Sequence, residues 1–164
     1  MFEKLLGLPA HPLLLHFAVV LVPMLVAASL AYALVPYVRR WITWAVLGLA
    51  VVTPFAVWFT TLSGNAFRNR LVARNMVSPE FLVKITQHKD FGDKTLWSVI
   101  PLAVLVTLAV ALVELARRSG TAPSPTSRVI TIALNVAIVF FAGASAYYVF
   151  KTGDSGARIV WGAF

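Results

Sequence analysis

Three histidines are the residues of this chain best equipped for chemistry, and two of them fall within one short stretch. His11 and His16 lie in GLPAHPLLLHFAVVLV, residues 7–22, at the start of an apolar run, and His88 lies ahead of another such run. Imidazole nitrogens bind zinc, copper and iron ions as well as haem iron. What these rings can bind depends on which parts of the fold bring them together.

Four apolar runs set the architecture. Of the 164 residues, 60% are hydrophobic and 12% are charged, which is outside the balance of soluble domains. Each run is long enough for the helix of about 20 residues that crosses a bilayer core. We therefore expect an all-α bundle of four transmembrane helices, forming a single integral membrane domain over residues 1–164. The spans are expected at about 12–35, 42–62, 95–115 and 129–150.

The connection between the second and third spans contains a helix start. Ser78, Pro79 and Glu80 supply a capping hydroxyl, a proline at the first helical position and an acid near the positive end of the helix dipole. We expect an interfacial amphipathic segment here, with Gly92 as a break and Asp93 as the cap of the next helix.

Helical geometry separates the two N-terminal histidines. His16 lies about one and a half turns below His11, and the two side chains differ in direction by about 140°. A polar ring in hydrocarbon is costly unless it is paired or liganded. We expect His16 to face the bundle and His11 to stay at the interface. A simpler structural interpretation bonds a neutral His16 to Thr60 or Thr61.

A b-type haem is one cofactor that this pattern predicts. His16 and His88, with His11 adjacent, offer imidazoles from different helices in an apolar bundle, as axial ligation of haem requires. Gly64 and Gly92 are candidates for close approach of the backbone to the macrocycle. Four aromatic residues are candidates to pack against its faces: Phe17, Phe55, Phe59 and Trp97.

A metal ion is the alternative cofactor. His11, His16 and His88 belong to the same expected membrane face as Asp154, and three imidazoles with one carboxylate form a suitable ligand set for zinc, copper or iron. The chain has no cysteine, which excludes thiolate-bound iron–sulfur clusters, disulfides and covalently attached c-type haem.

Other function classes lack their sequence signatures. No nucleophile with a neighbouring base and no phosphate-binding loop is present, so the protein is not expected to be an enzyme by itself. The net charge of +8 comes from basic residues beside the spans rather than along one soluble face. We interpret them as topology signals and lipid contacts and expect no nucleic-acid partner.

Four motifs resemble those of a small bacterial membrane family of unknown function, the DUF2231 type. They are GLPAHPLLLHFAVVLVP, SGNAF, HKDFGD and GDSGARIVWG, and the resemblance covers nearly the whole chain. It implies histidines at the positions of His11, His16 and His88, and commonly a fourth where this chain has Asp154. An aspartate ligates a metal ion but cannot replace an imidazole on haem iron. Some relatives are joined to Rieske-type iron–sulfur domains, which implies a place near electron transfer.

Two functional hypotheses remain open. In the first, the protein binds a b-type haem or a metal ion near one membrane face and exchanges electrons with a redox partner protein. In the second, it is a cofactor-free accessory or scaffold subunit that docks a partner. A homo-oligomer is compatible with either hypothesis.

The expected location is the bacterial cytoplasmic (inner) membrane, with multiple passes. A bare count of Lys and Arg favours cytoplasmic termini. The pairs Arg39–Arg40 and Arg117–Arg118 lie directly against span ends in short loops, and this placement favours termini on the outer side. We expect the termini outside.

Overall fold

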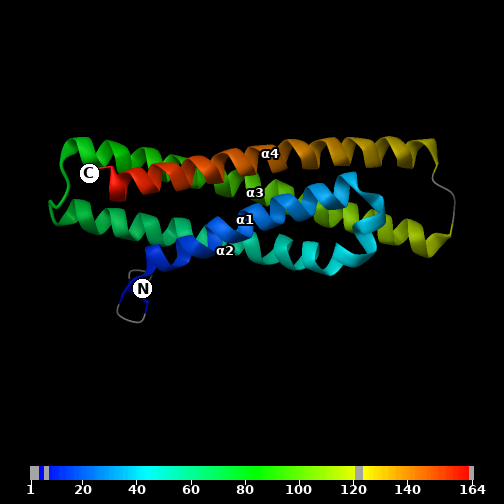
Figure 1. The fold of residues 1–164 in the computed structure, drawn as a ribbon, viewed down its shortest axis with the longest axis horizontal. Helices are drawn as coiled ribbons and strands as arrows, with labels where there is room; N and C mark the ends of the chain where they lie inside the picture. The colour runs from blue at the N-terminus through cyan, green and yellow to red at the C-terminus, as the bar shows by residue number, and fades with distance from the viewer. Residues whose placement is uncertain (1–3, 6–7, 121–123, 163–164) are drawn as a thin grey trace.

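The computed structural model describes residues 4–5, 8–120 and 124–162, and four long helices account for most of them (Figure 1). The helices are α1 (Ala10–Leu34), α2 (Arg39–Ala73), α3 (Pro79–Ser119) and α4 (Pro125–Trp161). All four are long and apolar enough to cross a membrane. The expected all-α bundle is confirmed. Two-residue strands β1 (Lys4–Leu5) and β2 (Leu8–Pro9) pair ahead of α1, and the short helix η1 (Pro36–Val38) joins α1 to α2.

The four helices form two antiparallel hairpins. Helix α1 packs against α2 and α4, and α3 packs against α4 and α2, so that α1 and α3 are diagonal neighbours. Helix α1 begins and α4 ends at the same end of the bundle as the α2–α3 connection, while the other two connections lie at the opposite end (Figure 1). This topology brings His11 and His88 to one end.

Local capping explains where the helices begin and end. The Ser78 hydroxyl accepts a hydrogen bond from the Phe81 backbone N–H at 3.2 Å, which confirms the expected start of α3. Helix α3 ends at Gly120, whose φ of 63° suits a residue without a side chain. At the α1–α2 turn, Arg39 donates to the carbonyls of Tyr32 and Ala33 at 2.8 and 3.1 Å, so it satisfies the exposed carboxyl end of α1.

The segment expected at the membrane surface is part of the long helices rather than a separate element. Only residues 74–78 join α2 to α3, and α3 runs through Gly92 without a break. Asp93 does not cap a helix but pairs with Lys89 one turn earlier. A single glycine weakens a helix by about 1 kcal/mol, and such a loss is tolerated where charge pairs and packing against neighbouring helices support the chain.

Three helices are longer than a membrane crossing requires. Helix α3 has 41 residues, which corresponds to about 60 Å at 1.5 Å per residue, whereas a crossing needs about 20 residues. The additional residues of α3 lie before the apolar run that begins near Thr95. Helices α2 and α4 extend past their apolar runs at the same end of the bundle. The end that carries His88 therefore extends beyond the hydrocarbon core.

The bundle interior is built from aliphatic and small side chains. Leu25, Leu102 and Ile138 are fully buried, and the Ser145 hydroxyl donates to that of Ser98 at 3.2 Å between α4 and α3. Small residues and hydroxyls of this kind let membrane helices approach closely.

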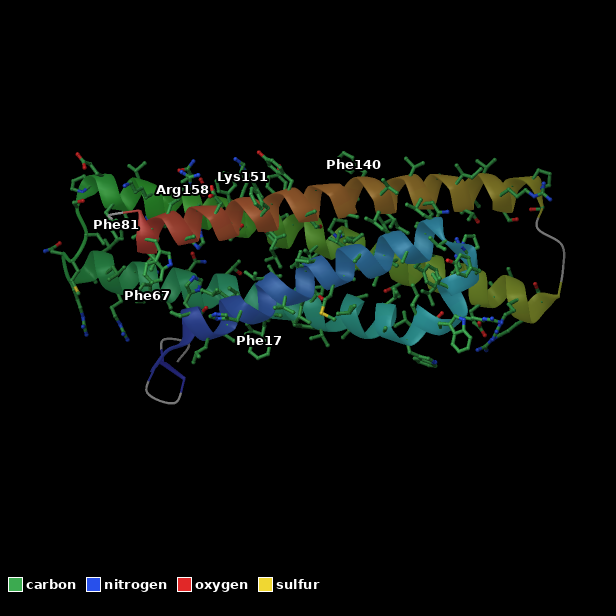
Figure 2. All side chains as sticks on the ribbon, in the orientation of Figure 1. Phe17, Phe67, Phe81, Phe140, Lys151 and Arg158 are labelled. Carbon is green, nitrogen blue, oxygen red and sulfur yellow. The ribbon has the colours of Figure 1, made fainter. Side chains whose placement is uncertain are left out.

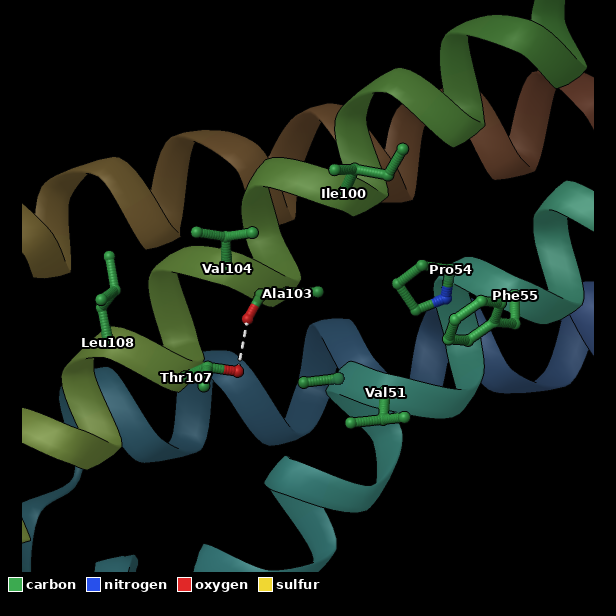
Figure 3. Close-up of a pocket in the computed structure, with 9 residues that line it drawn as sticks. Val51, Pro54, Phe55, Ile100, Ala103, Val104, Thr107 and Leu108 are labelled. Atoms are coloured by element: carbon green, nitrogen blue, oxygen red, sulfur yellow. Dashed lines mark hydrogen bonds between the residues drawn. The ribbon is translucent and has the colours of Figure 1, made fainter.

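An apolar cavity of about 380 Å³ lies between α2 and α3 beside Pro54 (Figure 3). Thr107 in its wall donates to the Ala103 carbonyl of its own helix at 2.8 Å, so that hydroxyl is already bonded. None of the three histidines lines this cavity.

Candidate functional site

His11 and His88 meet inside one end of the bundle. Their ring centroids are 6.3 Å apart and the ring planes cross at 79°, although the two residues come from the diagonal helices α1 and α3. Both side chains are half-buried. The structure thus brings together two of the three histidines that the sequence singled out.

Helix α2 holds the ring of His11. Its Nδ1 lies 3.1 Å from the Thr60 carbonyl oxygen and 3.2 Å from the Ser63 hydroxyl. A carbonyl only accepts, and the Ser63 hydroxyl donates its proton to that same Thr60 carbonyl at 2.8 Å. Nδ1 of His11 is therefore the protonated nitrogen, and in the neutral ring Nε2 carries a free lone pair.

Helix α4 holds the ring of His88 in the same manner. Its Nδ1 lies 3.0 Å from the Ser155 hydroxyl, and the backbone of Thr152 is a second partner. Because the Ser155 hydroxyl donates to the Thr152 carbonyl at 3.0 Å, it accepts from Nδ1–H of His88. The neutral His88 ring also presents Nε2 as its unprotonated nitrogen.

Glycines make room for both rings. A Cβ atom on Gly64 would lie 3.0 Å from Cε1 of His11, and one on Gly156 would lie 3.0 Å from Cε1 of His88. Both distances are shorter than ordinary van der Waals contact. Each ring is thus seated directly against the backbone of its partner helix.

The two halves of the site repeat one sequence pattern. Each histidine is held by a Thr-x-x-Ser-Gly stretch on the following helix, which reads TTLSG at 60–64 and TGDSG at 152–156. The register that places His11 on His88 also places buried residues of α1 on buried residues of α3. These pairs are Ala18–Thr95, Val22–Val99, Leu25–Leu102, Ser29–Val106, Tyr32–Ala109 and Ala33–Val110.

Helices α2 and α4 match in the same way. The register that places Gly64 on Gly156 also pairs buried positions Val46–Ile138, Ala50–Ala142 and Thr53–Ser145. The molecule is therefore a repeat of two hairpins that run in parallel directions, and the histidine pair lies where the two repeats meet.

His16 lies outside this site, which reverses the expected assignment of the two N-terminal histidines. Its side chain is exposed, and its Nδ1 bonds the Pro12 carbonyl of its own helix at 2.6 Å. The expected angular separation of the two rings explains the difference. Since Thr60 and Gly64 receive His11, the direction of His16 points out of the bundle.

The metal set of three histidines and Asp154 is not assembled. Among the described residues, no group of three or more His, Asp or Glu side chains is close enough to hold one ion. Asp154 instead accepts from Nε of Arg158 at 3.0 Å with both carboxylate oxygens. It lies on a different side of α4 from Ser155, which faces His88.

The remaining candidates for cofactor packing also lie elsewhere. A Cβ on Gly92 would have the Thr61 side chain as its near neighbour, at 3.9 Å, rather than either histidine. All four aromatic residues expected to cover a macrocycle are exposed on the outside of the bundle: Phe17, Phe55, Phe59 and Trp97. Figure 2 shows Phe17 on the outer side of α1. Such aromatic side chains are common on lipid-facing surfaces.

Sequence reasoning missed the residues that hold the rings. Ser63, Ser155 and Gly156 were not selected, although the Thr-x-x-Ser-Gly pattern occurs in two places in the chain, each time after an apolar run. A search for a repeat in parallel orientation would have found them.

The family model described as "Predicted membrane protein (DUF2231)" matches residues 7–163. No curated protein and no solved structure matches the chain.

The glycine contacts predict similar losses of stability when Gly64 and Gly156 are replaced. Replacing Gly64 or Gly156 with Ala places a methyl group 3.0 Å from a histidine ring, so each change should lower the free energy of unfolding by about 1–3 kcal/mol. Gly48→Ala is the control, because a Cβ there meets no atom of the described residues within 4 Å. Thermal unfolding in detergent measures all three. Equal stability of Gly48→Ala and Gly64→Ala would contradict the packing described above.

Proposed function

We propose that this chain, which belongs to the DUF2231 family of predicted membrane proteins, binds one transition-metal centre between His11 and His88, near one membrane face. The observation that carries the proposal is the matched pair of imidazoles, each with Nδ1–H bonded to a partner helix and Nε2 left to bind a ligand. This hydrogen-bond pattern is typical of metal-ligating histidines.

The distance between the rings supports a shared ion. Metal–imidazole bonds are about 2.0–2.1 Å long, so an ion held by both rings separates the two nitrogens by at most about 4 Å. The two ring centroids are 6.3 Å apart, which is within the reach of two such bonds once the size of each ring is added. The centre is either a free copper, iron or zinc ion or the iron of a b-type haem, because all of these accept imidazole nitrogen.

An electron-transfer role belongs to the proposal where the centre is copper or iron, since zinc has no redox chemistry. The half-buried rings limit the contact of the centre with water, which tunes a reduction potential. His88 precedes the apolar run that begins near Thr95 by about two turns of helix, or about 10 Å. The centre would thus lie close enough to the membrane surface to meet a redox partner protein.

Histidine variants test the proposal directly. Protein purified from its native membrane is expected to carry about one metal ion per chain by elemental analysis, or one haem by its Soret band. His11→Ala and His88→Ala should each lose the centre. His16→Ala is the matched control and should retain it, because His16 faces away from the pair.

Two results would overturn the proposal. One is wild-type protein with neither metal nor haem after supplementation with both. The other is equal loss in all three histidine variants. A cofactor-free protein would instead favour the accessory-subunit hypothesis.

The serine that orients His88 provides a second test. Ser155→Ala removes the hydroxyl that accepts from Nδ1–H, and loss of such an orienting partner weakens metal affinity by about 10–100-fold. Thr53→Ala is the control, since the buried Thr53 hydroxyl has no hydrogen-bond partner among the described residues. Titration of the metal-free protein with Cu²⁺ or Zn²⁺ measures the affinities. The same affinity for Ser155→Ala and wild type would contradict the assigned role.

The proposed location is the bacterial inner membrane, with the histidine end outside. The natural chain has no cysteine, so single cysteines report topology without background. Met76→Cys, in the α2–α3 connection, should react with a membrane-impermeant maleimide in intact cells. Thr126→Cys, at the start of α4, should react only after lysis. The reverse labelling pattern would place the site on the cytoplasmic side.

A further inference from the structure

A second cavity, of about 440 Å³, opens between α3 and α4 beside the histidine pair. Three cations line it, Lys84 from α3 and Lys151 and Arg158 from α4, against the single carboxylate of Asp154. Figure 2 shows Lys151 and Arg158 on the same outer side of α4. The cavity therefore carries net positive charge.

The acid in the cavity positions one of the cations. Asp154 accepts from Nε of Arg158 with both of its oxygens at 3.0 Å. This contact uses Nε alone, and within the described part of the chain no hydrogen bond occupies the two Nη nitrogens, which are donors for another acceptor. A planar fork of donors held in this way suits the oxygens of a phosphate group.

The place of the cavity points to a lipid. Lys151 directly follows the apolar run of α4, so the cavity begins where the hydrocarbon core is expected to end. Phe91 and Ile159 add apolar walls to the cationic ones. Basic pockets between membrane helices are suited to anionic headgroups, and apolar walls suit the adjoining glycerol and acyl chain.

The repeat shows that the charge is specific to the second hairpin. In the register that places Gly64 on Gly156, Lys151 matches Phe59 and Arg158 matches Ala66. Asp154 matches Leu62. The first hairpin thus has apolar residues at all three positions, although the residues that hold the histidine are the same in both.

We infer that the α3–α4 cavity binds the phosphate headgroup of an anionic phospholipid. None of the three histidines lines the cavity, but Ser155, whose hydroxyl bonds His88, lies in its wall. The lipid test therefore changes only cations that do not contact the histidines.

Lipid titration of the full-length protein in detergent tests the inference, with native mass spectrometry as the readout. Phosphatidylglycerol should bind saturably at one molecule per chain, and phosphatidylcholine should bind much more weakly. The double variant Lys84→Gln/Lys151→Gln should bind phosphatidylglycerol about 25-fold more weakly, at about fivefold for each cation removed. The variant Lys84→Arg/Lys151→Arg keeps both positive charges and should bind the lipid as wild type does. Such binding would show that substitution at these two positions leaves the fold intact.

Arg70→Gln/Arg74→Gln is the matched control, because it removes two cations at the same end of the bundle but outside the cavity. It should change lipid affinity by less than about twofold. Equal weakening by both glutamine pairs would overturn the inference in favour of diffuse surface charge. Displacement of the lipid by an equal concentration of inorganic phosphate would also overturn it, since the ligand would then be free phosphate.

Discussion

A polar ring inside a helical bundle must find its hydrogen-bond partners within the bundle, and this constraint organises the histidine end of the molecule. His11 reaches the Thr60 carbonyl and His88 reaches the Ser155 hydroxyl, so each hairpin is tied across its two helices at one height. The glycine beside each ring follows from the same requirement, because a side chain there would occupy the space of the imidazole. The register of α1 on α2, and of α3 on α4, is thereby fixed at this end.

The pairing of the two rings depends in turn on how the hairpins pack. Buried residues of α1 and α3 coincide in one register, and those of α2 and α4 coincide in another. Equivalent positions of the two hairpins therefore face one another across the bundle. The diagonal helices α1 and α3 bring the centroids of their histidine rings within 6.3 Å. The polar contacts that hold the rings are local to each hairpin, while the meeting of the rings is a property of the whole bundle.

The sequence was sufficient for the fold class, because runs of about 20 apolar residues have few alternatives in a bilayer. It also placed His11 and His88 at the same end, since an even number of spans returns the chain to its starting side. It was not sufficient to decide which of His11 and His16 faces inward. Periodicity gives the angle between two side chains but not the direction of the neighbouring helix, and Ser63 and Gly64 on α2 decide that direction. Gly92 does not break α3, because the low helix propensity of glycine is outweighed by the packing of a long helix against its neighbours.

Because the two hairpins belong to one chain, their sequences can differ at matching positions. In a symmetric dimer of two-helix hairpins, every substitution would appear twice, once on each side of the central axis. Here the connection between Ala73 and Pro79 makes the association of the hairpins intramolecular, with a high effective concentration that does not depend on expression level. One hairpin can then carry Lys151 and Arg158 while its counterpart carries Phe59 and Ala66 at the matching positions. The covalent link therefore allows the histidine pair to stay matched while the surfaces on either side of it differ.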